Sequence, residues 1–212
     1  MASDLRITVR DEVEANRPSR TFELSDKVLQ VAARLISSLD PAQQVVLVTG
    51  YDGTDGAADL AAQLSIGLAR VSQSKIAIID ADTGAPSLNK LLNAPDQPGL
   101  AELMTGSSDL DSVVKQFDTG VDLIPAGKAT KALTLPDCAR VIPELRSRYR
   151  YLVIAAGPLL SRVDTVTLAT LSDGILLVLR EWERNREDVI ALQREVARLR
   201  KRLLGAVLRE RK

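Results

Sequence analysis

Residues 45–71, VVLVTGYDGTDGAADLAAQLSIGLARV, decide the fold that this sequence predicts. The stretch opens with the apolar run 45–48, typical of a buried strand, and continues through a glycine-containing loop, residues 49–56. Apolar side chains at helical spacing follow the loop, at Leu60, Leu64, Leu68 and Val71. Strand, glycine loop and helix in this order are the layout of a phosphate-binding loop, in which backbone N–H groups and the helix N-terminus hold an anion. The alternative is a plain strand-to-helix turn that has never bound phosphate.

The side chains that a phosphate-binding loop needs are missing from this stretch. A working loop reads G-x-x-x-x-G-K-[ST]. Gly56 fits the second glycine, but Tyr51 takes the first position, and Ala57 and Ala58 replace the lysine and the hydroxyl residue. The loop therefore offers no ammonium group to the terminal phosphates and no hydroxyl to Mg²⁺.

Two carboxylates, Asp52 and Asp55, stand where a phosphate would approach the loop. Each would oppose a bound polyphosphate by about 1 to 4 kcal/mol, depending on its exposure. We therefore expect a pocket that has no cation of its own and rejects a triphosphate. The vestige of the nucleotide site would comprise Gly53, Asp55, Gly56, Ala57 and Ala58.

Composition narrows the classes of protein. A chain of 212 residues, 45% hydrophobic, suits one large domain with a substantial core. Lysine plus arginine and aspartate plus glutamate both number 28, so no net positive charge recruits nucleic acid. The lack of histidine and the single Cys138 exclude histidine bases, histidine or cysteine-cluster metal sites and an intrachain disulfide. No apolar run reaches about 18 residues and no signal peptide is evident, so we expect a cytoplasmic protein.

A second stretch, KIAIIDAD at residues 75–82, predicts another buried strand. It ends in Asp80 and Asp82, at the carboxyl edge where ligands of open α/β sheets bind. The two carboxylates could hold Mg²⁺, or they could cap the turn that follows.

The remaining pattern alternates between strands and helices. We expect further strands at 121–125, 151–154, 174–179 and 206–208, and helices at 26–39, 88–92, 99–106, 109–117, 136–148 and 187–203. Ser25 is the expected N-cap of the first helix, and Pro143 should kink or restart the helix that contains it. This alternation predicts an α/β fold with one doubly wound, mainly parallel sheet and helices on both faces.

The first 24 residues are the only separable piece of the chain. We expect residues 1–24 to form a polar, disordered or partner-bound lead and residues 25–212 to form the single domain. The alternation of Leu5, Ile7 and Val9 with polar neighbours leaves an edge strand as the alternative.

The order of these motifs resembles the cytoplasmic domain of bacterial tyrosine kinases, the autokinases of capsule and exopolysaccharide assembly. These kinases belong to the MinD/ParA group of deviant P-loop ATPases. Four stretches carry the resemblance: Gln44–Leu68, Ile76–Leu88 (IAIIDADTGAPSL), Gly99–Gly127 and Tyr149–Arg180. The resemblance covers most of the chain, about residues 44–208, and it implies a P-loop fold.

The same resemblance implies that the active site has been lost. Only Asp80 and Asp82 keep the residue type of the family's motifs. Ala57 stands at the position of the family's loop lysine, Ala58 at that of the hydroxyl residue and Asp52 at that of the extra lysine. Gly84 stands at the position of the second-motif arginine, and Ala155 at that of the third-motif aspartate. No tyrosine-rich tail follows Tyr151, and Arg34 alone remains of the residues that build the kinase ring.

We therefore expect a pseudokinase with no catalytic residues and no cofactor. It would dock on a membrane polysaccharide co-polymerase or a related kinase subunit, meet the membrane only through that partner, and could form a homo-oligomer. Trp182 is a candidate contact residue. A basic end could meet lipid phosphates or be a solvated helix face: Arg198, Arg200, Lys201, Arg202, Arg209, Arg211 and Lys212.

Two alternative functions remain open. A residual autokinase or ATPase would still bind ATP and Mg²⁺ through the backbone of residues 53–56 with Asp80 and Asp82. A positioning protein like MinD or ParA would form nucleotide-driven dimers, although many MinD-type proteins end in an amphipathic membrane helix that this sequence does not show.

Overall fold

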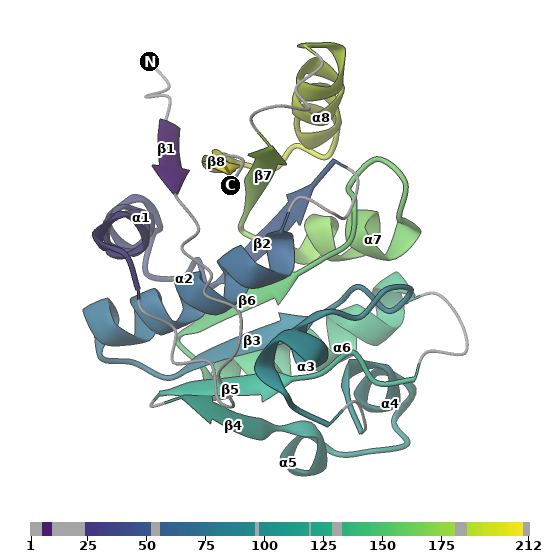
Figure 1. Ribbon diagram of the computed structural model, residues 1–212. Coiled ribbons are helices and arrows are strands. Elements are labelled where there is room, and N and C mark those ends of the chain that lie inside the picture. Colours follow the sequence, from purple (N-terminus) through teal and green to yellow (C-terminus); the bar gives the residue numbers. More distant parts are fainter. Residues whose placement is uncertain are drawn as a thin grey trace.

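The computed structural model describes residues 6–9, 24–51, 56–95, 98–118, 120–128, 133–180 and 186–209. These residues contain one eight-stranded sheet with the strand order β1-β8-β7-β2-β6-β3-β5-β4 (Figure 1). Every neighbouring pair is parallel except β4 and β5, which are antiparallel. The expected doubly wound, mainly parallel α/β fold is confirmed.

The bounds of the elements follow the sequence pattern closely in the centre of the sheet. The strands are β1 Arg6–Val9, β2 Val45–Gly50, β3 Ile76–Asp80, β4 Lys115–Asp118, β5 Val121–Ile124, β6 Tyr151–Ala155, β7 Gly174–Arg180 and β8 Leu203–Arg209. The helices are α1 Asp26–Ser38, α2 Ala57–Ser72, α3 Leu88–Leu92, α4 Leu100–Thr105, α5 Leu110–Val113, α6 Leu135–Arg148, α7 Val163–Leu171 and α8 Arg186–Arg198.

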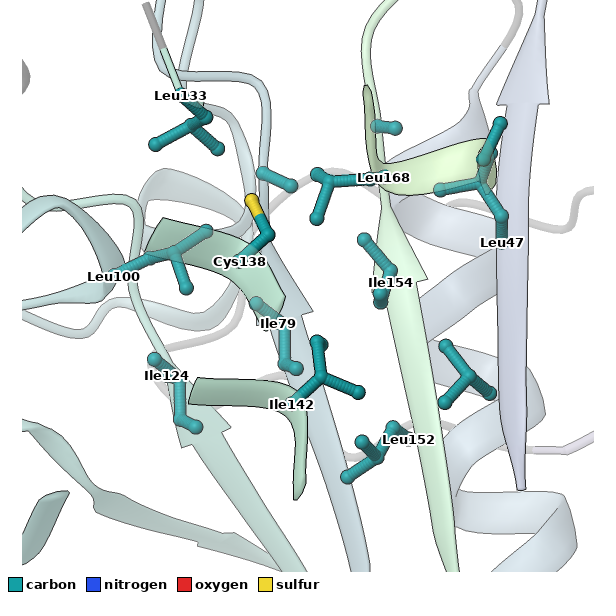
Figure 2. Packing of buried hydrophobic residues seen from close by; sticks show 14 of the residues in the cluster. Leu47, Ile79, Leu100, Ile124, Leu133, Cys138, Ile142, Leu152, Ile154 and Leu168 are labelled. Carbon is teal, nitrogen blue, oxygen red and sulfur yellow. The ribbon is translucent and has the colours of Figure 1, made fainter. Parts of the chain in front are cut away.

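The central strands are buried because helices cover both faces of the sheet. Val46 and Val48 of β2 pack with α1, α2 and α3, whereas Val45 and Leu47 point to the other face, where α4 to α8 pack. Figure 2 shows this second core, in which Leu47 and other strand residues meet the helical side chains. Side chains alternate between the faces of a strand, so a strand covered on both faces must be apolar throughout.

Several expected elements are confirmed and others are wrong. The side chain of Ser25 accepts a hydrogen bond from the Val28 N–H, so the predicted N-cap is confirmed. The restart expected at Pro143 is wrong: this exposed residue lies inside one helix, α6. Residues 6–9 form the edge strand β1, which pairs with β8, so the edge-strand alternative holds there.

Two helix ends were also misplaced. The helix expected at 109–117 stops at Val113, because Lys115–Asp118 forms a hairpin with β5 around Gly120, whose φ is +78°. The helix expected to reach residue 203 stops at Arg198, and Leu203 already belongs to β8. Among the described helices, none is long and apolar enough to cross a membrane.

The packing in Figure 2 yields a stability prediction. Strand β6 lies between β2 and β3, and its Leu152 side chain is completely buried in the core. Leu152→Ala should therefore lower the free energy of unfolding by about 2 to 5 kcal/mol. Urea denaturation measures this loss. The matched control is Val71→Ala on α2, where the side chain is 43% exposed and the loss should be small. Equal losses in the two variants would contradict the assigned core.

Candidate functional site

The candidate site lies where the carboxyl ends of β2, β6 and β3 meet, with β6 in the middle. Ala155 at the end of β6 pairs in register with Val48 on one side and Asp80 on the other. The structure thus brings together three features: Asp80 of the second motif, Ala155 at the position of the third-motif aspartate, and β2, which leads into the loop. Of the predicted loop residues, Gly53 and Asp55, together with Asp52, lie outside the described residues.

Of the two alanines at the lysine and hydroxyl positions, Ala57 belongs to the hydrophobic core and Ala58 is partly buried against it. Ala57 and Ala58 form the first turn of α2, and both pack with the apolar cluster beneath that helix. Ala57 is 9% exposed. Neither position can present a polar group to a ligand.

The start of the loop is tied to the segment that follows β6. The Thr49 hydroxyl donates to the Gly157 carbonyl at 2.7 Å, and the Thr165 hydroxyl donates to the same carbonyl at 3.0 Å. A backbone bond of 3.2 Å also runs from the Leu159 N–H to the Gly50 carbonyl. The loop entrance and the β6–α7 segment are therefore held as one body.

A cation from the last strand lies at the loop, contrary to the expected pocket without a cation. Gly56 precedes α2 with φ +84°, and the guanidinium of Arg209 lies directly against it. A Cβ on Gly56 would fall 1.4 Å from Arg209 Nη1. Arg209 Nη2 also donates to Asp59 Oδ2 at 3.1 Å, and both side chains are about four-fifths buried. Burial lowers the pKa of the Arg209 guanidinium.

Asp80 is buried and its carboxylate is occupied by backbone donors. Its oxygens accept the N–H groups of Asp82 at 3.2 Å, Ser87 at 3.0 Å and Leu88 at 2.9 Å. Burial raises the pKa of Asp80 to about 6, although these hydrogen bonds oppose the rise. The geometry favours the capping role over the metal role for this residue.

Asp82 forms an ion pair with an arginine that sequence reasoning missed. Asp82 Oδ1 accepts the Ala85 N–H at 3.2 Å and Arg162 Nη2 at 3.3 Å. The same guanidinium covers Gly84, where a Cβ would lie 1.9 Å from Nη2. Gly84 is the position of the second-motif arginine in the resemblance, so a guanidinium is present there but comes from another segment.

The next residue of this loop is also tied to the β6–α7 segment. The Thr83 hydroxyl donates to Asp164 Oδ2 at 2.8 Å, and Asp164 Oδ1 accepts the Leu133 N–H at 2.8 Å. Within the described part of the chain, no group of three or more histidine, cysteine, aspartate or glutamate side chains could hold a metal ion. Asp80 and Asp82 thus remain an isolated candidate pair.

The structure describes only some of the other predicted contact residues. Trp182 lies outside the described residues, as do Arg211 and Lys212. Arg209 lies at the loop rather than on a basic surface. Three more members of the basic end contact the protein itself: Arg198 pairs with Glu195, Lys201 donates to the Ser172 carbonyl and Arg202 donates to the Ser38 carbonyl.

The raised pKa of Asp80 predicts a dependence of stability on pH. The native state keeps the Asp80 proton up to about pH 6, whereas the unfolded state loses it near pH 3.8. Stability should therefore fall as the pH rises through this window, with Asp80 contributing about 3 kcal/mol of the loss. In urea denaturation from pH 3.5 to 7, Asp80→Asn should lack this part of the slope. Parallel curves for the two proteins would show the assignment to be wrong.

Comparison with known proteins gives relatives that include bacterial tyrosine kinases and a polysaccharide transport protein. No protein-family model matches the chain. The succinoglycan biosynthesis transport protein ExoP of Rhizobium meliloti is 27% identical over 174 residues, which are 78% of this chain and 22% of ExoP. The tyrosine-protein kinase YwqD of Bacillus subtilis is 22% identical over 181 residues, which are 83% of this chain and 76% of YwqD. The chain thus spans less than a quarter of the length of ExoP.

Solved structures share the fold. The kinase domain of the Escherichia coli tyrosine kinase ETK superposes with a TM-score of 0.77 at 22% identity, over 87% of this chain and 75% of the domain. A plasmid partition protein from Borrelia burgdorferi superposes with a TM-score of 0.63 at 20% identity, over 79% and 78% of the two chains. The homologues and structural neighbours of this chain thus include bacterial tyrosine kinases, and its fold is that of the MinD/ParA-like P-loop proteins.

Proposed function

We propose that this chain is a catalytically inactive, tyrosine-kinase-like protein that acts by protein–protein contact in exopolysaccharide or capsule biosynthesis and export. The observation that carries the proposal is the first turn of α2, where Ala57 is buried in the core and Ala58 packs against it. Phosphoryl transfer depends almost wholly on positioned charge and metal. The engagement of Asp80 with three backbone N–H groups supports the same conclusion.

The process is inferred from the relatives. ExoP is by name a succinoglycan biosynthesis transport protein, and YwqD is by name a tyrosine-protein kinase. By this similarity the partner is a membrane polysaccharide co-polymerase or an active kinase subunit. The chain itself would be cytoplasmic and would reach the inner face of the membrane through that partner.

Exposed apolar side chains on the segments of the carboxyl edge support a role in protein binding. Hydrogen bonds from Leu159 to Gly50 and from Leu133 to Asp164 join the segments of this edge. These segments carry four large apolar side chains that are 40% to 70% exposed: Tyr51, Leu135, Leu160 and Val163. When such side chains gather in one patch, they commonly mark a site of protein contact.

The proposal of inactivity predicts that Mg²⁺·ATP does not bind. Isothermal titration of the protein with ATP and Mg²⁺ should give no saturable heat at millimolar nucleotide, while the kinase YwqD binds under the same conditions. Tight binding would overturn the proposal and favour the residual autokinase. A phosphotransfer assay with Asp80→Asn as the control would then decide whether the protein turns over. Dimers that form only with nucleotide, seen by light scattering, would instead favour a positioning protein.

The apolar surface predicts where the partner binds. Val163 is 70% exposed at the start of α7, so Val163→Asp should leave the fold intact. The variant should bind the cytoplasmic part of the partner co-polymerase at least tenfold more weakly, a loss of about 1.4 kcal/mol or more, because a charge enters an apolar contact. The matched control is Val71→Asp. Val71 lies at the C-terminal end of α2, the end away from the carboxyl edge, so this variant should bind like the wild type. Equal affinity of both variants would place the interface elsewhere.

A further inference from the structure

We infer that two internal arginine–aspartate pairs hold the start of α2 and the loop after β3 in one arrangement, with the two guanidinium groups lying against Gly56 and Gly84. The pairs are Arg209 with Asp59 and Arg162 with Asp82. The inference rests on the proposed function and deepens it, since it states what holds the loops when no nucleotide does.

The first pair joins the last strand to the helix of the loop. Only β7 separates β8 from β2 in the sheet, so the carboxyl end of β8 lies near the N-terminus of α2. Arg209 extends across this distance and lies flat on Gly56, with Nη1, Cζ and Cδ all within 3.1 Å of the position of a Cβ. Asp59, in the first turn of α2, accepts Nη2 and fixes the guanidinium there.

The second pair joins the loop after β3 to the segment before α7. The side chains of Asp82 and Arg162 lie between two glycines, Gly84 and Gly157. A Cβ on Gly157 would lie 3.1 Å from both Asp82 Cγ and Arg162 Cγ, and a Cβ on Gly84 would collide with the Arg162 guanidinium. The two glycines thus leave room for the pair where it lies, and a side chain at either position would make one of the paired side chains shift.

The charges of these pairs explain why they close the site instead of attracting an anion. Each guanidinium already contacts a carboxylate, and each pair is partly buried. A phosphate that entered would have to displace Arg209 or Arg162 and separate it from Asp59 or Asp82. Separating one member of a buried pair leaves an uncompensated charge in a poorly solvated place, which is costly. The lock therefore holds without any ligand.

The test moves the arginine that pairs with Asp82 from residue 162 to residue 84. Arg162→Gly removes the pair and should loosen the loop, whereas Gly84→Arg alone places a second guanidinium where that of Arg162 lies. The double variant Gly84→Arg/Arg162→Gly supplies a guanidinium beside Asp82 from residue 84 and should restore the loop. Gly84→Ala/Arg162→Gly is the matched control, because it removes the collision but supplies no guanidinium.

Amide hydrogen exchange at Ala85, whose N–H is bonded to Asp82, is the readout. Exchange should quicken about tenfold in Arg162→Gly and in the alanine control, and should return to within about twofold of the wild type in the arginine double variant. For the first pair, Arg209→Ala should quicken exchange at Leu60, whose N–H is bonded to Gly56 in the first turn of α2, and Arg209→Lys should recover part of the protection.

The outcomes separate the lock from the proposed function. Wild-type exchange rates in Arg162→Gly and Arg209→Ala would overturn the lock, as would equal rates in the arginine and alanine double variants. Neither result would alter the case for inactivity, which rests on nucleotide titration of the wild type. Nucleotide binding by the wild type, with exchange quickened in the variants as expected, would overturn inactivity and leave the lock as the ligand-free state.

Discussion

The strands β2, β6 and β3 run side by side in parallel, and helices cover both of their faces. This double burial is the constraint on which the rest of the structure depends. It forces the three strands to be apolar along their length, so polar side chains can appear only at their ends. The carboxyl ends gather Asp80, Ala155 and the entrance of the loop at one edge. The composition of that edge decides the chemistry that the protein can perform.

The charges at this edge are balanced within the protein. A site for a triphosphate and Mg²⁺ presents cations to the phosphates and carboxylates to the metal, and the ligand links the two sets. Here two carboxylates meet arginines from distant segments, and Asp80 meets the backbone of its own loop. An exposed ion pair contributes about 0 to 1 kcal/mol. The pairs of Arg209 and Arg162 are partly buried and join separate segments, so their effect is on the geometry of the edge more than on global stability.

Much of the fold could be predicted from short apolar runs, while the arginines at the site could not. The short apolar runs at 76–79 and 151–154 predicted β3 and β6, because a run of this length and composition is typical of a strand buried on both faces. By contrast, α7 was missed because its valines and threonines favour strands. The helical spacing of Leu110, Val113 and Phe117 was overridden by the hairpin with β5.

The positions of Arg209 and Arg162 depend on long-range topology, which local patterns do not carry. The strand order shows that the end of β8 lies near the loop, two places from β2 in the sheet. With that order known, an arginine at the end of the last strand would be a candidate cation for the loop. Arg162 follows the third motif directly, and the glycine at residue 84 is the signal that could have found it, because the missing side chain leaves room for another.

The survival of Asp80 and Asp82 does not require that catalysis survives. A carboxylate at the end of β3 is buried, so it must find donors or stay protonated. Asp80 finds three N–H groups in the turn that leads to α3, and Asp82 finds one N–H group and Arg162. Replacing Asp80 would remove the acceptor of three N–H groups, and replacing Asp82 would remove the partner of Arg162, so either change should loosen the turn. Folding alone is therefore enough to account for aspartates at these two positions, whereas no folding contact requires a lysine at Ala57 or a hydroxyl at Ala58.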